Sequence, residues 1–194
     1  MTRAAKPKIP DKRAAILETT LGLLSERGFH DTPMSMIARQ AGVSTGIIYH
    51  YFSGKEELIY ELYREIKLRM LHVVAEGFCD QTSYRERFLV LWRNLIQYHI
   101  DHPRETVFLE QFENSPYYKP DWQAAFADEM APFIAFFLRG VQDGVLKDLP
   151  FEVAAELSFM VAVSLAKRHI RGAIRLTDEL IEAAANASWD AVHG

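Results

Sequence analysis

The chain has 194 residues, of which 49% are hydrophobic and 12% aromatic, enough for one large domain or a small domain joined to a larger one. Its net charge of −4, taken alone, argues against a nucleic-acid partner. A single cysteine excludes a disulfide framework, and the sequence has neither a run of 18 apolar residues nor an apolar signal segment, so we expect a soluble, cytoplasmic protein with no membrane partner.

The charge is distributed unevenly along the chain. Residues 1–55 carry eight Lys or Arg against four Asp or Glu, whereas residues 56–194 carry fourteen against twenty-two. A basic N-terminal quarter on an acidic body fits a head that reads DNA, although ordinary surface variation is the alternative. The first ten residues include Arg3, Lys6 and Lys8 and predict a basic arm, which lies along DNA phosphates or is a solvated tail.

The N-terminal quarter predicts three short helices. Asp11 can cap a first helix that runs to about Arg27, and Gly28 can end it. The stretch from Thr32 to Lys55 then predicts a short helix, a tight turn, a second short helix and the start of a longer one. This order and these lengths are typical of a helix-turn-helix.

Local signals set the turns and caps of this stretch. Thr32 is a suitable N-cap for the first short helix, and Gly42 can end that helix by adopting a positive φ. Ser44 is expected to cap the next helix. Ser53 and Glu56 have the spacing of a capping box at the start of the helix that follows.

The remainder of the chain predicts only helices, because no strand-like alternation of useful length occurs. Pro132 lies within the helix predicted from Trp122 to Gly140 and is expected to kink or break it. We therefore predict an all-α fold of about nine helices. Beyond the three short helices they run from Lys55 to about Phe78, Tyr84 to Asp101, Pro103 to Asn114, Trp122 to Gly140, Pro150 to Arg171 and Asp178 to Val192.

The run IARQAGVSTGIIYHYFSGKEEL resembles the DNA-binding signature of the tetracycline-repressor (TetR) family of bacterial transcription regulators. The resemblance implies a DNA-binding domain over residues 1–54 and a ligand-binding and dimerisation domain over residues 55–194. The sequence departs from the common pattern at Gly54, where a polar residue is frequent. The matching positions are Ile37, Ala38, Ala41, Gly42, Val43, Ser44, Gly46, Tyr49, Tyr51, Phe52, Lys55, Glu56 and Leu58.

A recognition helix needs small and polar side chains at its N-terminal half so that it can approach the major groove. Thr45 and Gly46 fit that need, and Lys55 adds a cation at a helix N-terminus. Tyr49 can reach DNA or pack within the head, and His50 can reach DNA or be ordinary surface. From the residues and the resemblance together, the candidate DNA contacts are Ser35, Arg39, Ser44, Thr45, Gly46, Tyr49, His50 and Lys55.

The body is rich in aromatic residues, and the resemblance implies a small-molecule pocket in its helices. Aromatic walls suit a flat or apolar effector, whereas the alternative is that most of these rings fill the core. Glu110 and Glu113 could favour a cationic ligand or form a solvated acidic face. The candidate lining residues are Trp92, Tyr98, Phe112, Tyr118, Trp122 and Phe126.

The last two predicted helices combine small with large apolar residues, which allows close packing within the core or between subunits. A helix-turn-helix head needs a partner to read two half-sites, so we expect a two-fold homodimer through these helices. His99 and His102 have the spacing of metal ligands, but a third ligand is not evident, and we predict neither a metal nor a cofactor.

These observations predict a ligand-responsive transcriptional regulator rather than an enzyme. The expected partners are a double-stranded, palindromic DNA operator and a small apolar or aromatic effector whose binding releases a repressor. The alternatives are a helical enzyme or an adaptor that uses the aromatic pocket without binding DNA. The enzyme alternative is not supported by a Gly-rich phosphate loop, a nucleophile elbow or a metal triad.

Overall fold

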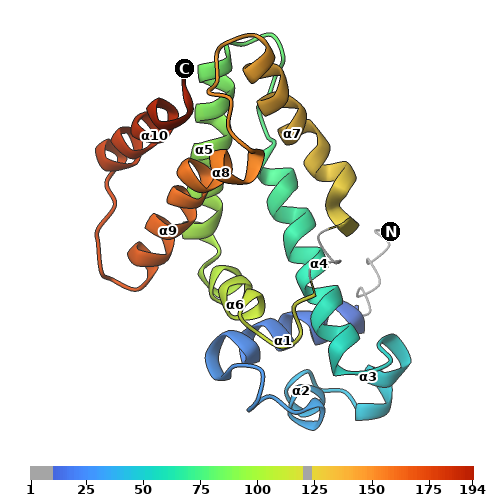
Figure 1. The fold of residues 1–194 in the computed structure, drawn as a ribbon. Coiled ribbons are helices and arrows are strands. Elements are labelled where there is room, and N and C mark those ends of the chain that lie inside the picture. The colour runs from blue at the N-terminus through green and yellow to red at the C-terminus, as the bar shows by residue number, and fades with distance from the viewer. Residues whose placement is uncertain (1–10, 120–123) are drawn as a thin grey trace, which may run out of the picture.

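A computed structural model describes residues 11–119 and 124–194, and within these ranges the fold is all-α, as predicted (Figure 1). Ten helices are present there rather than about nine, because the helix expected from Pro150 to Arg171 is interrupted at Ser158 (φ −123°, ψ −76°). The described helices are α1 (Lys12–Arg27), α2 (Met34–Gln40), α3 (Thr45–Tyr51), α4 (Lys55–Val74), α5 (Tyr84–Asp101), α6 (Pro103–Glu113), α7 (Ala127–Gln142), α8 (Phe151–Leu157), α9 (Phe159–Ile170) and α10 (Asp178–Val192).

Helices α1, α2 and α3 and the beginning of α4 form a compact head, at the bottom of Figure 1. Each of these helices contributes apolar side chains at a spacing of three or four residues, which places them on one face. These faces meet in a common core, from which water is excluded. The buried head residues include Ile16, Leu17, Leu21, Leu24, Ile37, Ile48, Phe52 and Leu58.

The predicted turn glycines and two predicted caps are confirmed. The Asp11 side chain caps α1 and accepts a hydrogen bond from the backbone N–H of Arg13 at 3.0 Å. Gly28 and Gly42 have φ values of +76° and +68°, in the left-handed region that favours glycine. The Ser44 side chain accepts a hydrogen bond from the backbone N–H of Ile47 at 3.3 Å. The turn between α2 and α3 therefore forms from local signals, as expected.

Two other caps were predicted wrongly. The Thr32 hydroxyl donates to the carbonyl of Gly28 at 2.8 Å and is buried, so Thr32 secures the preceding turn and does not cap α2. At the start of α4 the backbone N–H of Ser53 donates to the carboxylate of Glu57, not of Glu56. Thr32 therefore bonds to a backbone group other than the predicted one, whereas the N–H of Ser53 bonds to the carboxylate one position beyond the predicted one.

Helix α4 leaves the head and enters the body, where it packs against α5 (Figure 1). Helix α5 is the centre of the body, because it also packs against α9 and α10. A capping box starts α5: the Ser83 side chain accepts from the backbone N–H of Glu86 at 3.2 Å and the Glu86 carboxylate accepts from that of Ser83 at 2.9 Å. Helix α7 continues through Pro132.

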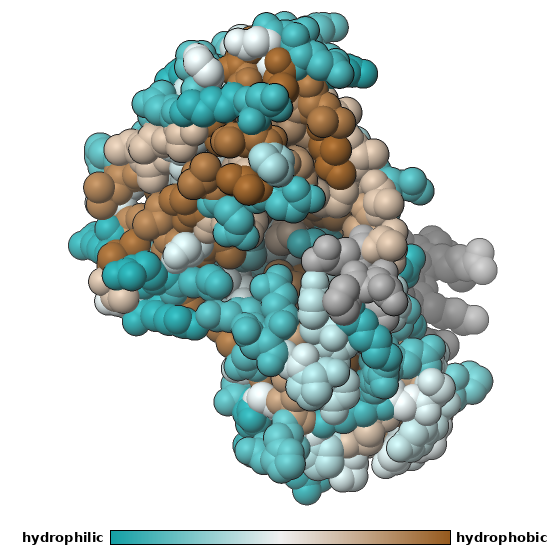
Figure 2. All heavy atoms as spheres, in the orientation of Figure 1, coloured by the Kyte–Doolittle hydropathy of each residue, from teal (hydrophilic) through white to brown (hydrophobic). Residues whose placement is uncertain are grey.

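The surface differs between the two parts of the molecule. Figure 2 shows mostly hydrophilic surface over the head and extended hydrophobic areas over the body. The predicted basic arm, residues 1–10, lies outside the described residues. Among the helices that the structure describes, no helix combines the length and the apolar character needed to span a bilayer.

Candidate DNA-binding surface and effector cavity

The α2–turn–α3 unit presents a continuous set of polar side chains to solvent. The N–H of Val43 donates to the carbonyl of Ala38 at 3.0 Å, which holds the turn against α2. Ile48 of α3 is fully buried, and this anchor leaves the opposite side of α3 at the surface. The unit is a short surface helix supported by a second helix, the geometry that places side chains into a major groove.

Most of the predicted DNA contacts are exposed on α2, on the turn or on α3. Tyr49 is 54% exposed, so its ring does not pack within the head. The ring of His50 makes an edge contact with that of Tyr51, with centroids 5.3 Å apart. Thr45 is half-buried at the first position of α3. The remaining exposed candidates are Ser35, Arg39, Ser44 and Gly46.

Lys55 is placed differently from the other candidates. Its ammonium group donates to the backbone carbonyl of Phe29, and partial burial lowers the pKa of the Lys55 side chain. This bond ties the start of α4 to the turn after α1. A phosphate contact by Lys55 stays a prediction, and it would require the ammonium group to leave or share this carbonyl.

Four of the aromatic residues predicted to bind an effector lie in the packed core: Trp92, Tyr98, Phe112 and Phe126. Trp92 is fully buried, and its indole N–H donates to the carbonyl of Ser158 at 3.2 Å. Tyr98 is 2% exposed and donates to the carboxylate of Glu105. These bonds satisfy the polar atoms of both rings within the protein, as burial requires.

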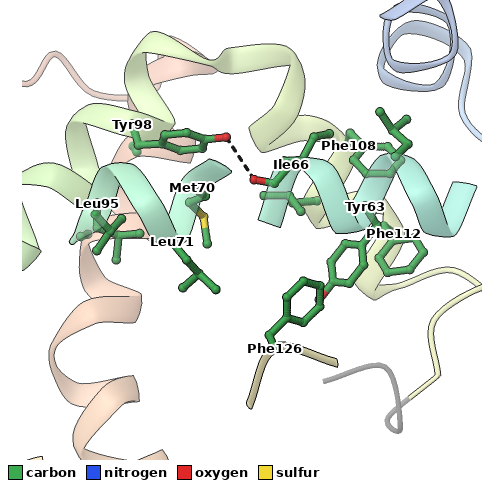
Figure 3. Close-up of a cluster of buried hydrophobic side chains, with 14 of the residues drawn as sticks. Tyr63, Ile66, Met70, Leu71, Leu95, Tyr98, Phe108, Phe112 and Phe126 are labelled. Atoms are coloured by element: carbon green, nitrogen blue, oxygen red, sulfur yellow. Dashed lines mark hydrogen bonds between the residues drawn. The ribbon is translucent and has the colours of Figure 1, made fainter. Parts of the chain in front are cut away.

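Phe112 and Phe126 pack around Tyr63 of α4, as Figure 3 shows. The ring of Tyr63 stacks on that of Phe112, with centroids 4.4 Å apart, and meets that of Phe126 edge-on at 5.6 Å. Burial raises the pKa of the Tyr63 hydroxyl to about 12. Tyr118 contacts Phe112 edge-on at 6.0 Å, and Trp122 lies outside the described residues. An effector role for these residues stays a prediction.

Two adjoining cavities lie beside this core. The larger has a volume of about 330 Å³ and includes several charged and polar side chains. The smaller, of about 160 Å³, is apolar apart from Lys67, and both cavities share Lys67, Met70, Leu95 and Met160. The lining of the larger cavity is Lys67, Met70, Leu95, His99, Thr106, Leu109, Glu113, Glu156, Met160, Val163, Ser164 and Lys167.

The inner polar wall of the larger cavity is formed by α5 and α6. The Thr106 hydroxyl has carbonyl acceptors at His99 (3.0 Å) and His102 (3.1 Å), so its oxygen accepts from Nδ1–H of His99 at 2.8 Å. Nε2 of His99 is thereby left as a hydrogen-bond acceptor. Burial first, and then the charges of Lys67, Lys167 and His102, lower the pKa of His99 to about 4.

Lys67 is the cation common to both cavities. Within the described part of the chain it makes no hydrogen bond or ion pair. Burial lowers the pKa of its ammonium group, and the negative charge of Glu113 opposes that shift. In contrast, Lys167 lies 3.7 Å from a carboxylate oxygen of Glu110.

Comparison with known proteins agrees with this architecture. A family described as "Bacterial regulatory proteins, tetR family" matches residues 16–62, and one described as "Tetracyclin repressor-like, C-terminal domain" matches residues 83–193, more than half of the chain. The chain belongs to the TetR family. The first match covers the helix-turn-helix, so this is a TetR-type, DNA-binding transcriptional regulator.

Individual relatives extend over nearly the whole chain. A TetR family regulator from Marinobacter aquaeolei is 29% identical, with a TM-score of 0.87 over 94% of this chain and 95% of that one. A putative TetR family regulator from Vibrio parahaemolyticus is 32% identical, with a TM-score of 0.82 over 95% and 99%. A helix-turn-helix transcriptional regulator from Haemophilus influenzae is 23% identical over 98% of both chains.

Membership of the TetR family confirms the family resemblance and the all-α class, while the individual site residues stay predictions. Sequence reasoning missed the cavity lining, of which Lys67 is the clearest case. A signal was present, because Lys67 follows Tyr63 by four residues and precedes Met70 by three, on the buried side of α4. Among the described residues no group of three His, Cys, Asp or Glu side chains could hold a metal ion.

Proposed function

We propose that this TetR regulator is a homodimeric repressor that leaves a palindromic operator when a small molecule occupies the two adjoining cavities. The observation that carries the proposal is the dual role of α4 and α6. Lys67 and Met70 of α4, and Thr106 and Leu109 of α6, line the larger cavity. The same two helices also contact the head, so a ligand that moves them changes the position of α3.

The contact between α6 and the head is aromatic and direct. Phe29, which follows α1, lies with its ring centroid 6.1 Å from that of Phe108 and 6.5 Å from that of Phe112, both on α6. Its ring also lies 5.4 Å from that of Tyr117, in the loop after α6. Packed rings transmit displacement because they cannot be compressed. In this proposal residues 1–54 are the DNA-binding domain and residues 55–194 the ligand-binding and dimerisation domain.

The proposed dimer interface is the apolar outer face of α8, α9 and α10. Large apolar side chains are exposed there, and Leu180 is 52% exposed. Exposed apolar side chains that gather on one face mark protein contacts, and a two-fold axis would pair this face with itself. The other exposed members are Val153 and Leu157.

An effector can shift operator affinity only if it binds the two conformations of the dimer unequally. The test therefore starts with selection of an operator from a random duplex pool, followed by fluorescence anisotropy at several salt concentrations. We expect a two-fold symmetric site whose affinity falls steeply with salt, because phosphate contacts release counterions. Candidate ligands are then added, and operator affinity that is unchanged at saturating ligand would refute release by an effector.

A further inference from the structure

The position of Lys67 defines the chemistry that the two cavities share. Lys67, together with Met70, belongs to the wall of both the polar and the apolar cavity. A molecule that extends from one cavity into the other must pass this ammonium group. Its charge is not balanced by a bonded partner in the described part of the chain. Withdrawing an unpaired charge from water costs free energy, which a ligand of opposite charge would offset.

The carboxylates of the larger cavity are at its rim. Glu113 and Glu156 are both exposed to solvent, whereas His99 is 4% exposed and Thr106 2%. Behind this rim lie two half-buried lysines, Lys67 and Lys167, and the neutral pair of His99 and Thr106. Lys167 is paired with the carboxylate of Glu110, which leaves Lys67 as the lysine of this cavity without a bonded carboxylate among the described residues. An anionic group placed there gains more from Lys67 than it loses to carboxylates that solvent screens.

The smaller cavity offers the complementary apolar compartment. Its walls come from α4, α5, α7, α8 and α9 and carry four phenylalanine rings with aliphatic side chains between them. Lys67 is its one charged lining residue. Burial of an alkyl chain against such walls is favourable in proportion to the apolar area covered. The phenylalanines are Phe133, Phe137, Phe151 and Phe159.

We propose that the effector is an amphipathic monoanion, with a single carboxylate or similar group beside Lys67 and an apolar tail in the compartment lined by α7 and α8. This inference rests on the proposed function, of which it specifies the ligand class. It differs from the expectation of a purely apolar or aromatic effector, because the anionic end provides orientation and selectivity. Cations and neutral molecules of the same length bind more weakly.

Three probes that share a ten-carbon chain separate charge from length: decanoate, 1-decanol and decyltrimethylammonium, each below its micelle concentration. Their binding to the full chain without DNA is measured by isothermal titration calorimetry at pH 7.5. We expect decanoate to bind at least tenfold more tightly than decanol and the cation to bind most weakly. Equal affinity for decanoate and decanol, or preference for the cation, would overturn the proposal.

Lys67→Met removes the charge and keeps the length of the side chain. It should weaken decanoate binding at least tenfold and change decanol binding less than threefold, while Lys67→Arg retains most of the preference for decanoate. Arg64→Met, which removes an exposed cation from the same helix, is the matched control and should change neither. Unchanged decanoate binding in Lys67→Met would refute the assignment.

Folding and function are controlled separately. The thermal midpoint of Lys67→Met should equal or exceed that of the wild type, because the variant removes an enclosed charge without a bonded partner. Operator affinity with decanoate is then measured by anisotropy. If decanoate binds through Lys67 but the operator complex stays intact, release by an effector is refuted and the ligand class is not. If a molecule releases the operator equally from the wild type and Lys67→Met, the ligand class is refuted and release by an effector is not.

Discussion

The head and the cavities are built in opposite ways. The candidate DNA contacts occupy one stretch from Ser35 to Lys55 and mostly face water. The cavity walls are drawn from five helices in each case, and the larger extends from Lys67 to Lys167 in the chain. A surface that reads DNA can thus be encoded in one local segment, whereas a cavity exists only after distant helices have packed.

The two regions also differ in what one charge does. In the head, solvent and counterions screen single charges, so affinity for DNA accumulates over many contacts. In the cavities, Lys67 is partly withdrawn from water and the low dielectric strengthens its interactions. We therefore expect the DNA affinity of the head to depend on the total charge of its surface. The ligand affinity of the cavities should depend on individual side chains.

The largest loss of operator affinity should come from a negative charge on the surface of the head that faces DNA. Gly46→Asp places a carboxylate on the exposed side of α3, against the phosphates of a bound operator. Because each dimer carries the change twice, operator affinity should fall roughly 1,000-fold, about 4 kcal/mol. Anisotropy with the selected operator measures this loss.

The matched control is Gln81→Glu, which adds a carboxylate at an exposed position of the body. It should change operator affinity less than threefold. The unfolding midpoint of Gly46→Asp should not fall, because a carboxylate in the first turn of a helix is favourable. Wild-type operator binding by Gly46→Asp would show that α3 does not face the groove.

The next prediction tests whether dimerisation of the body increases the affinity of the head for DNA. Leu180→Glu puts a charge on the apolar outer face of α10, where a two-fold contact would bury it in both subunits. We expect the dimer to weaken by about 3 kcal/mol, about 1.5 kcal/mol for each lost leucine. Sedimentation velocity measures the dissociation constant, and operator affinity should decrease with it.

Leu138→Glu supplies the control, because Leu138 of α7 is 56% exposed and lies outside the proposed interface. It should leave the dimer intact. If both variants dissociate equally, or neither does, the outer face of α8, α9 and α10 is not the interface.

The contrast between the two regions also explains what could be predicted from the sequence. The turn at Gly42 and the cap at Ser44 follow from backbone and hydrogen-bonding chemistry within a few residues, and both are present. The interruption at Ser158 carries no glycine or proline signal. There the carbonyl of Ser158 accepts from the indole of Trp92, so the break is stabilised by a residue 66 positions away.

The same reasoning applies to the cavity residues. The aromatic rings stand out in the sequence, but Trp92 and Tyr98 find their polar partners inside the protein and lie in the core. Lys67 has little prominence as one lysine among charged residues of α4. Its significance appears only from its register with Tyr63 and Met70. A charged residue on a buried helical face is the sequence signal that best indicates a cavity here.

A further prediction concerns the titration of His99. Its folded pKa of about 4 lies below the ordinary value of 6.5, owing first to burial and then to Lys67, Lys167 and His102. The unfolded chain binds the proton more readily, so the stability from neutral His99 is complete above pH 6.5 and is lost as pH falls toward 4. We expect a loss of about 3 kcal/mol over this interval in urea unfolding at successive pH values.

His99→Asn retains a donor toward the Thr106 hydroxyl and does not titrate. The free energy of unfolding that is lost between pH 6.5 and 4 should therefore be smaller in this variant by that amount. Exposed His72 of α4 provides the comparison, because His72→Asn should leave the slope unchanged. Parallel profiles for the wild type and His99→Asn would show that His99 is not protected from protonation.

The smallest effect contrasts a glycine of the head, Gly46, with a glycine of the body, Gly140. A Cβ at Gly140 would lie 2.5 Å from Cδ1 and 2.7 Å from Cγ of Leu146, which is 4% exposed and cannot move freely. A Cβ at Gly46 would meet only the Ser44 side chain, at 3.9 Å. Alanine gains up to about 1 kcal/mol over glycine within a helix, whereas overpacking costs about 1–3 kcal/mol.

Gly140→Ala should therefore lower the free energy of unfolding by about 1 kcal/mol, and Gly46→Ala should leave it unchanged or raise it slightly. Urea unfolding measures both, and Leu146→Ala completes a double-mutant cycle with Gly140→Ala. Because Leu146→Ala removes the atoms that clash, the double variant should be more stable than the sum of the single losses implies. Strict additivity would show that the packing around Gly140 is as open as the surface around Gly46.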